Sequence, residues 1–334
     1  MGLCSSKRKR LNLNSFEIHF LIGEGKYGRI YVATQKSTKQ KYAIKMIPKS
    51  KLLENKMVEH AFQERNALSL ISSPFVIKMK HCFQDEDNLY FVLDWINGND
   101  LFDHLINFTT FPENITQFYA AELILALQDI HNKGFIHGDL KPENILIDPT
   151  GHICLIDFGS SISIEKIGLN GDIPVFGSYQ YMAPEALKLG KPGFAVDLWS
   201  LGAILYEMVH GRPPHYAETQ QQTIDNILNE ELEFKPQISD QLKSLLTGLL
   251  QKKPENRLGY NGIDEIKNHP FFENINWNKV AKKETNPVLV PGPKHIFSDH
   301  KNQLEELILL SIISKKDQKF FHNFEFNPFV DDMI

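Results

Sequence analysis

The feature that most constrains the fold is a glycine-rich turn that is followed by a strand. Residues 23–28 read Gly-Glu-Gly-Lys-Tyr-Gly, and glycine, which has no Cβ, lets a backbone turn tightly and approach phosphate oxygens. Dinucleotide-binding folds use the same spacing, but there a helix follows the turn. Here residues 29–33 have the composition of a strand. The sequence therefore predicts a phosphate-binding turn within a β-rich segment and argues against a dinucleotide-binding fold.

The spacing of apolar residues divides the chain into a β-rich part and a helical part. Residues 16–96 show strand patterns around one helix, and residues 97–272 are mostly helical. We therefore expect an α+β fold with two lobes, 16–96 and 97–272, between an N-terminal segment, 1–15, and a C-terminal tail, 273–334. The predicted strands cover 16–22, 30–34, 41–47, 76–83 and 89–94, and the predicted helices cover 57–71, 115–133, 196–210, 219–229 and 238–251.

Composition excludes several classes of protein. The chain has 334 residues, of which 42% are hydrophobic and 23% charged, an ordinary globular balance. Its three cysteines have no paired spacing, which argues against a disulfide framework and against a Cys-based zinc site. No run of 18 apolar residues predicts a transmembrane helix. The net charge of −5 makes nucleic acid an unexpected partner.

A lysine and a glutamate complete the predicted phosphate site. Lys45 lies 22 residues after Gly23, at the end of the strand pattern Tyr-Ala-Ile-Lys. A lysine at this place can hold the α and β phosphates of a nucleotide, and it needs a carboxylate to orient it. Glu64, on the helix that follows, is the candidate for that carboxylate.

A second motif supplies groups for proton transfer and metal binding. Residues 137–144 read His-Gly-Asp-Leu-Lys-Pro-Glu-Asn, and Asp-Phe-Gly follows at 157–159. Asp139 is placed to accept a hydroxyl proton, and Lys141 to neutralise phosphate charge. Asn144 and Asp157 offer oxygen ligands, which Mg²⁺ prefers.

The ordered series of motifs resembles the eukaryotic protein kinases over residues 16–272. The series continues with Ala-Pro-Glu at 183–185, with Asp197 in Asp-Leu-Trp-Ser-Leu-Gly, and with Arg257. The resemblance implies the bilobal protein kinase fold, with residues 93–96 as the hinge over adenine. It also implies a buried ion pair between Glu185 and Arg257, and an Asp197 carboxylate that supports the catalytic-loop backbone.

Further segments resemble the AGC group of serine/threonine kinases, which includes protein kinases A and C. These segments are residues 88–94, 206–208 and 267–272. The terminal sequence Phe-His-Asn-Phe-Glu-Phe at 321–326 is similar to the hydrophobic motif of that group, in the form found in atypical protein kinase C. In that comparison Phe321, Phe324 and Phe326 are the aromatic residues, and Glu325 stands where many members carry a phosphorylated residue.

The resemblance implies a complete set of site residues for a Ser/Thr protein kinase that uses ATP and Mg²⁺. The catalytic residues are Asp139, Lys141 and Lys45, and the metal ligands are Asn144 and Asp157. The ATP-binding residues are Gly23, Glu24, Gly25, Gly28, Ile30, Ala43, Lys45, Glu64, Leu93, Asp94, Ile96, Asp100 and Asn144.

The expected partners are proteins with a serine or threonine near basic residues. Asp100, Glu143 and Glu207 match positions where the protein kinase A family binds arginine upstream of the target residue, and carboxylates favour basic peptides by charge complementarity. Ser178 takes the place of the usual threonine in the wall that receives the residue after the target. We therefore assign Asp100, Glu143, Ser178 and Glu207 to substrate binding.

Two departures from the kinase pattern are linked. Gly138 replaces the arginine that usually precedes the catalytic aspartate and pairs with phosphate on the activation loop. The usual phosphorylated threonine falls on Pro174, which has no hydroxyl. The phosphate-binding arginine and the hydroxyl that would carry the phosphate are both missing. We therefore expect activity that does not depend on phosphorylation at that position.

The first ten residues predict lipid attachment. Gly2 and Ser6 fit the myristoylation pattern, and Cys4 can accept a palmitoyl chain. Lys7, Arg8, Lys9 and Arg10 can face anionic lipid. One myristoyl chain binds membranes weakly and needs a second signal. We therefore expect attachment to the cytoplasmic face of a membrane, with a cytoplasmic pool, whereas a flexible basic tail or a nuclear-localisation-like run is the alternative.

Two other functions compete with an active kinase. A pseudokinase scaffold would keep the fold and bind nucleotide without turnover, and a missing Lys45, Asp139 or Asp157 would favour it. All three are present. A nucleic-acid-binding module rests only on the basic residues 7–10.

Overall fold

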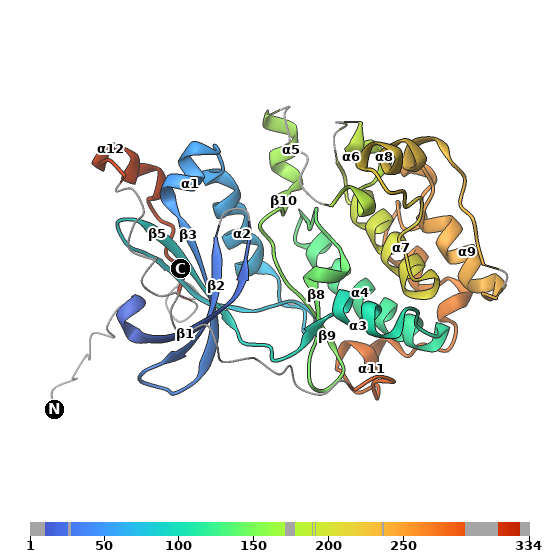
Figure 1. Ribbon diagram of the computed structural model, residues 1–334, viewed down its shortest axis with the longest axis horizontal. Coiled ribbons are helices and arrows are strands. Elements are labelled where there is room, and N and C mark those ends of the chain that lie inside the picture. The colour runs from blue at the N-terminus through green and yellow to red at the C-terminus, as the bar shows by residue number, and fades with distance from the viewer. Residues whose placement is uncertain are drawn as a thin grey trace. The chain divides into compact units, whose positions relative to one another are not determined.

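The computed structural model describes residues 11–25, 28–170, 178–188, 190, 192–235, 237–290 and 313–327. Within it the chain forms two compact units (Figure 1). Of the described residues, the first unit contains those in 11–65, 78–95 and 313–327, and the second contains those in 66–77 and 96–290. The predicted lipidation residues Gly2 and Cys4, the basic residues 7–10 and the activation-loop position Pro174 lie outside the described residues.

The first unit is built on a five-stranded antiparallel sheet with strand order β1-β2-β3-β5-β4. β3 and β5 are buried along almost their whole length, whereas β1, at one edge of the sheet, is mostly half-buried or exposed. Two helices lie between β3 and β4 in the sequence, and a short helix followed by a 3₁₀ turn at Lys319–Phe321 belongs to the C-terminal segment. The elements are β1 (Phe16–Glu24), β2 (Arg29–Gln35), β3 (Lys41–Pro48), α1 (Lys49–Glu54), α2 (Val58–Leu70), β4 (Met79–Gln84), β5 (Asn88–Asp94) and α12 (Lys315–Gln318).

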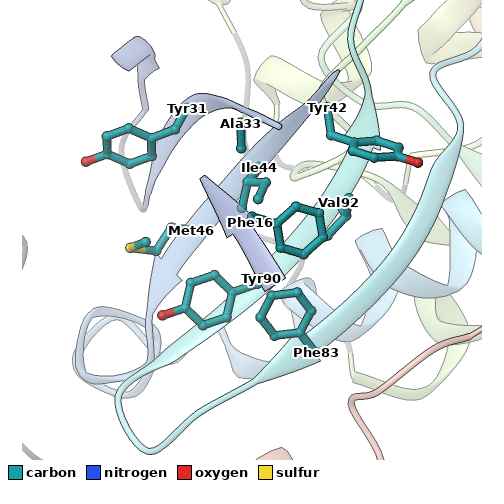
Figure 2. Packing of buried hydrophobic residues seen from close by; sticks show 9 residues of the cluster. All are labelled: Phe16, Tyr31, Ala33, Tyr42, Ile44, Met46, Phe83, Tyr90 and Val92. Carbon is teal, nitrogen blue, oxygen red and sulfur yellow. The ribbon is translucent and has the colours of Figure 1, made fainter. Parts of the chain in front are cut away.

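An aromatic-rich cluster forms the core on one side of this sheet (Figure 2). The ring of Phe16 stacks on Phe83 at 6.2 Å and meets Tyr42 edge-on at 6.1 Å, and Phe83 stacks on Tyr90 at 4.8 Å. Offset and edge-to-face arrangements at these separations are favourable for aromatic rings. The cluster joins all five strands through Phe16, Tyr31, Ala33, Tyr42, Ile44, Met46, Phe83, Tyr90 and Val92.

The second unit is mainly helical, and its central helix is α7, which is buried on almost every side. α4 and α9 pack against α7, so the unit has one continuous apolar core. The helices are α3 (Leu101–Phe108), α4 (Glu113–Asn132), α5 (Ile164–Asn170), α6 (Pro184–Leu187), α7 (Ala195–His210), α8 (Gln220–Asn229), α9 (Asp240–Leu249), α10 (Asp264–Lys267) and α11 (Trp277–Ala281).

Short strands hold the loops of the second unit. One three-stranded sheet has the order β6-β8-β9, and β10 pairs with β7 in a two-stranded sheet. The turn between β7 and β8 contains the 3₁₀ helix Pro142–Asn144. The strands are β6 (Asn99–Asp100), β7 (Phe135–Ile136), β8 (Ile145–Ile147), β9 (Ile153–Leu155) and β10 (Ile162–Ser163).

Most predicted elements are confirmed to within a few residues, and one strand is wrong at its start. The predicted strand 76–83 begins only at Met79, because Val76 instead forms a parallel bridge with Leu155 and Ile77 N donates to the carbonyl of Leu155. α4 ends at Asn132, just before Gly134, whose φ of 77° suits glycine. Among the described residues no helix is both long enough and apolar enough to cross a bilayer.

Candidate active site

The glycine-rich turn joins β1 to β2 and depends on a glycine at its end. The amide of Gly25 donates to the carbonyl of Gly28 at 2.8 Å. A Cβ on Gly28 would lie 2.4 Å from the carbonyl oxygen of Met46, so no other residue fits there without moving β3. Glu24 forms an ion pair with Arg29 across the turn, at 3.0 Å. Lys26 and Tyr27 lie outside the described residues.

Lys45 and Glu64 form the ion pair that the sequence predicted. Lys45 Nζ lies 2.6 Å from Glu64 Oε1, and both side chains are largely buried. β3 supplies the lysine and α2 supplies the glutamate. The carboxylate holds the ammonium group in a fixed position in the first unit, where a charge-assisted hydrogen bond is strong.

Strand pairing fixes the backbone positions of the other predicted nucleotide residues in the first unit. Ile30 pairs with Lys45, and Ala43 pairs with Leu93. Asp94 ends β5 and forms an ion pair with Lys80 at 3.0 Å. Ile96 and Asp100 belong to the second unit.

In the second unit, Asp139 is held by three neighbours. Asn144 Nδ2 donates to the Asp139 carbonyl at 2.8 Å and to Oδ2 at 3.2 Å. Lys141 Nζ lies 3.1 Å from Asp139 Oδ2. The amide of Ser178 donates to Asp139 Oδ1 at 3.3 Å, and Lys141 Nζ donates to Ser178 Oγ at 3.2 Å. Three of the predicted site residues, Lys141, Asn144 and Ser178, thus converge on the partly exposed carboxylate of Asp139.

Asp197 supports the backbone before Asp139, as the resemblance implied. Its carboxylate accepts the amide protons of His137 at 2.9 Å and Gly138 at 3.0 Å, and it pairs with His131 Nε2 at 2.8 Å. Burial opposes ionisation of Asp197. The hydrogen bonds from His131 and Gly138 outweigh it, so the pKa of Asp197 lies below its ordinary value.

Gly138 has a left-handed backbone conformation, with φ of 77°. A Cβ at this position would approach the carbonyl oxygen of Ser160 within 2.8 Å. The sequence identified the missing arginine at this position, but not the conformation that accompanies it.

Asn144 and Asp157 have the donor atoms that suit Mg²⁺. The Nδ2 of Asn144 is used as a donor to Asp139, so its Oδ1 is the atom that can ligate a cation. Asp157 has a φ of 59°, and its Oδ1 accepts the amide proton of Gly159 at 3.2 Å. Mg²⁺ is usually bound by one or two such side chains together with substrate phosphates. These residues therefore fit the ion.

The predicted substrate carboxylates lie in three different environments. Glu143 is exposed, and Asp100 caps α3 by accepting the amide proton of Asp103 at 2.8 Å. Glu207 is buried and accepts a hydrogen bond from the Tyr181 hydroxyl at 2.6 Å. Burial raises the pKa of Glu207 to about 7, and the nearby charge of Glu143 adds to this rise.

Glu185 and Arg257 form the ion pair that the resemblance implied, and two nitrogens of the arginine contact the carboxylate. Arg257 Nη1 and Nη2 lie 2.7 and 2.9 Å from the two carboxylate oxygens of Glu185. Arg257 also donates to the carbonyl of Ala195 at 2.6 Å and lies over the ring of Trp199 at 5.3 Å. The arginine thereby links α6 to the start of α7.

Two hydrophobic-motif residues of the C-terminal tail, Phe321 and Phe324, are buried in the first unit. Phe324 meets Phe62 of α2 at 5.5 Å and Phe91 of β5 at 5.3 Å, in both cases edge to face. Phe321 is also fully buried, whereas Glu325 is exposed and Phe326 is half-buried. Phe326 and Cys82 exchange two backbone hydrogen bonds of 3.1 Å.

Sequence reasoning missed three residues that hold this tail. Lys49 Nζ donates to Gln318 Oε1 at 2.8 Å and to the carbonyl of Asp85 at 2.6 Å. Arg65 donates to the carbonyl of Asn323. Gln84 Nε2 donates to the carbonyl of Phe321 at 2.9 Å. No local sequence pattern identifies these side chains, because the tail residue that each one contacts is more than 200 positions away in the sequence.

Comparisons with known proteins agree with these arrangements. The sequence pattern of the protein kinase domain matches residues 16–272. The chain is 38% identical over 324 residues to a probable serine/threonine-protein kinase of Dictyostelium discoideum, which covers 95% of this chain and 71% of the relative. It is 40% identical over 337 residues to serine/threonine-protein kinase Sgk1 of Gallus gallus, covering 95% of this chain and 78% of the relative. It is 39% identical over 297 residues to a RAC family serine/threonine-protein kinase homolog of Dictyostelium discoideum, covering 88% and 66%.

Proposed function

Because the chain belongs to the protein kinase family and is a serine/threonine kinase of the AGC type, we propose that Asp139 and its neighbours transfer the γ-phosphoryl group of ATP to proteins. The observation that supports this most is the convergence of Asn144, Lys141 and Ser178 on the Asp139 carboxylate. Phosphoryl transfer needs alignment and charge neutralisation rather than covalent chemistry from the protein.

In this mechanism Asp139 orients the substrate hydroxyl and accepts its proton. The Asn144 side chain donates a hydrogen bond to Asp139 Oδ2 at 3.2 Å, and the Ser178 amide donates one to Oδ1 at 3.3 Å. These two hydrogen bonds fix the plane of the carboxylate. Lys141, which lies 3.1 Å from Asp139, offsets negative charge on the transferring group. A base held in this way contributes about 10²–10⁴-fold to the rate.

The nucleotide is held by the residues of the glycine-rich turn and by Lys45. Glu64 Oε1 lies 2.6 Å from Lys45 Nζ and keeps the ammonium group in place. Because the lysine side chain is already ordered, it can bind the α and β phosphates without a further entropic cost. Asn144 and Asp157 would hold Mg²⁺, which when bound supplies positive charge that screens the phosphates.

Phosphate transfer from labelled ATP to a library of basic peptides tests this function. Wild-type protein is expected to label serine- or threonine-containing peptides, and Asp139→Asn is expected to lose at least about 10²-fold in turnover while it still binds ATP. Asp225→Asn serves as the matched control, because Asp225 is exposed on α8. Turnover by Asp139→Asn within threefold of wild type would overturn the role of Asp139. Nucleotide binding without turnover by wild type would support the pseudokinase alternative.

The proposed substrates carry basic residues near the target. Glu143 and Asp100 provide acidic groups at accessible or half-buried positions. The pKa of Glu207 is raised to about 7, so its carboxyl group is ionised in only a fraction of the molecules at neutral pH. The proposed preference for basic peptides therefore strengthens as pH rises through this value.

The proposed role of the C-terminal tail is to hold α2, and through α2 to hold Glu64. Phe324 packs on Phe62, two positions before Glu64, and Arg65 binds the tail backbone at Asn323. Glu325 supplies one permanent negative charge where a phosphate would supply about 1.5 to 2. The tail thus needs no modification to dock.

The N-terminal segment is proposed to attach the kinase to a membrane. The support is in the sequence, where Gly2, Cys4 and the basic residues 7–10 combine two lipidation signals with positive charge. Attachment would place the kinase at an anionic membrane surface, with the remainder in the cytoplasm.

A further inference from the structure

The second unit has a hollow between the end of α7 and the chain that follows α8. Its volume is about 270 Å³. This is slightly below the ~300–1,000 Å³ of small-molecule sites and suits one or two side chains of a peptide. Its lining includes Tyr206, Arg212, His215, Tyr216 and residues 230–233. None of the proposed catalytic residues contributes to it.

The walls of the hollow are held by hydrogen bonds and ring stacking. The Tyr206 hydroxyl donates to the carbonyl of Glu233 at 2.6 Å, and the Tyr206 ring stacks on His210 at 3.9 Å. Asn226 Nδ2 donates to the carbonyl of His215 at 3.4 Å. The hollow is therefore preformed, which lowers the entropic cost of binding.

The charge of the lining is negative. Glu230, Glu231 and Glu233 are exposed, and Arg212 is the one cationic residue among the lining residues. Within the described part of the chain, none of these three carboxylates lies within 4 Å of a basic side-chain nitrogen. Lys252, outside the lining, interacts electrostatically with Glu230 and Glu231 and offsets only part of their charge.

The histidine in the wall does not cancel this charge. Burial, with a smaller effect from Lys252, lowers the pKa of His215 to about 4, so its imidazole is neutral at physiological pH. Its Nε2 atom is buried and has no hydrogen-bond partner in the described residues. Tyr216 beside it is 46% exposed, and an accessible tyrosine ring attracts cations through its π face.

We propose that this hollow is a docking site for a basic segment of a protein substrate, separate from the residues around Asp139. An arginine or lysine side chain would enter between Tyr206 and Tyr216 and face the carboxylates of Glu230, Glu231 and Glu233. The negative lining repels nucleic acid and anionic lipid, and the volume holds a side chain rather than a folded surface. The proposal rests on the proposed kinase function only in taking the partner to be a substrate.

The test uses the full-length protein and one serine peptide in several forms. One form is short, and the others carry an Arg-Lys-Arg segment or a Gly-Ser-Gly segment on Gly/Ser spacers of graded length, on either side of the serine. The basic extension is expected to lower KM about tenfold for at least one spacer, equivalent to about 1.4 kcal/mol, with kcat unchanged. Binding of the fluorescently labelled extension alone is measured in parallel by polarisation.

The deciding variant is Glu230→Gln/Glu231→Gln/Glu233→Gln. It is expected to keep wild-type KM for the short peptide and to lose the gain from the basic extension. The matched control is Glu255→Gln/Glu273→Gln/Glu284→Gln, three exposed carboxylates elsewhere in the same unit. This control makes the same change in net charge and should keep the gain, and melting temperatures should confirm that both variants fold.

Three results would overturn the proposal. They are the absence of any KM gain in wild type, a gain that survives in the deciding variant, and an equal loss in the matched control. If no peptide is phosphorylated, the kinase function fails on its own. The polarisation measurement then still decides whether the hollow binds the basic segment.

Discussion

The carbonyl oxygen of Ser160 occupies the space where a side chain at Gly138 would begin, since a Cβ there would come within 2.8 Å of it. Gly138 also has a φ of 77°, which L-residues adopt at a cost of about 1–2 kcal/mol. The glycine is thus required by the backbone, and the missing arginine cannot be restored by a simple substitution. The loop that carries Ser160 lies directly against the catalytic loop instead.

We expect activity that does not require phosphorylation at the usual activation-loop position. An arginine beside the catalytic aspartate normally binds that phosphate, and here Gly138 has no side chain and Pro174 has no hydroxyl. Protein made in bacteria, treated with phosphatase and checked by mass spectrometry, should keep most of its activity. A loss of more than about tenfold, some 1.4 kcal/mol in barrier terms, that an upstream kinase reverses by acting within residues 160–178 would contradict this expectation.

Phe324→Ala should lower both stability and activity. The ring is fully buried between Phe62 and Phe91, and removal of a buried phenylalanine ring typically costs about 3–5 kcal/mol. Activity should fall because α2, which carries Glu64, loses its contact with the tail. Phe320→Ala is the control, because Phe320 in the same segment is 52% exposed. Melting temperature and turnover are measured for both, and equal effects would remove the tail's proposed role.

The affinity for arginine-containing peptides should increase between about pH 6 and pH 8. The sign follows from Glu207, whose pKa is raised by burial to about 7, so its carboxylate gains negative charge over this range. Tyr181, which donates to it, stays protonated because burial raises the pKa of that hydroxyl, and Glu143 is the other charged group that acts on it. KM for an Arg peptide is compared with KM for a Gln-substituted peptide. Glu207→Gln should abolish the difference in slope, and an unchanged slope would exclude Glu207 from substrate binding.

Gly2→Ala should move the protein from the membrane fraction to the cytosol. Without Gly2 no myristoyl chain can be attached, and the basic residues 7–10 alone bind anionic lipid weakly. Cells that express each form are fractionated, and Ser5→Ala, which keeps Gly2 and Ser6, is the control. If wild type and Gly2→Ala sediment equally with membranes, lipidation does not carry the attachment.

The ordered motifs predicted the chemistry-bearing contacts because each motif is local and its partner is another motif. The order of the motifs predicted the pair of Lys45 with Glu64, and the resemblance to the protein kinases implied the pair of Glu185 with Arg257; both pairs lie in contact. The start of β4 could not be predicted in this way. Val76 is apolar, like Met79 and Cys82 of the strand that follows, but it bridges to Leu155, and both Val76 and Leu155 belong to the second unit.

The residues that hold the tail are also beyond sequence patterns. Lys49 looks like a surface charge at the start of a short helix, yet it is almost completely buried and lies 5.0 Å from the ring centre of Phe321. Burial lowers the pKa of Lys49, while the neighbouring acidic residues Asp85, Glu86 and Asp87 oppose this change. The burial of Lys49 depends on where the tail residue Gln318 lies in the folded chain. The spacing of apolar residues does not predict that position.

The backbone pairing of Phe326 with Cys82 also bears on self-association of this kinase. β4 is the last strand in the order β1-β2-β3-β5-β4, and an uncovered edge strand can pair with the strand of another molecule. The tail forms two backbone hydrogen bonds with Cys82, and its Phe321 carbonyl accepts a hydrogen bond from the Gln84 side chain. A kinase that has lost this tail therefore exposes an open sheet edge, and it should tend to self-associate through β4 even where its fold survives.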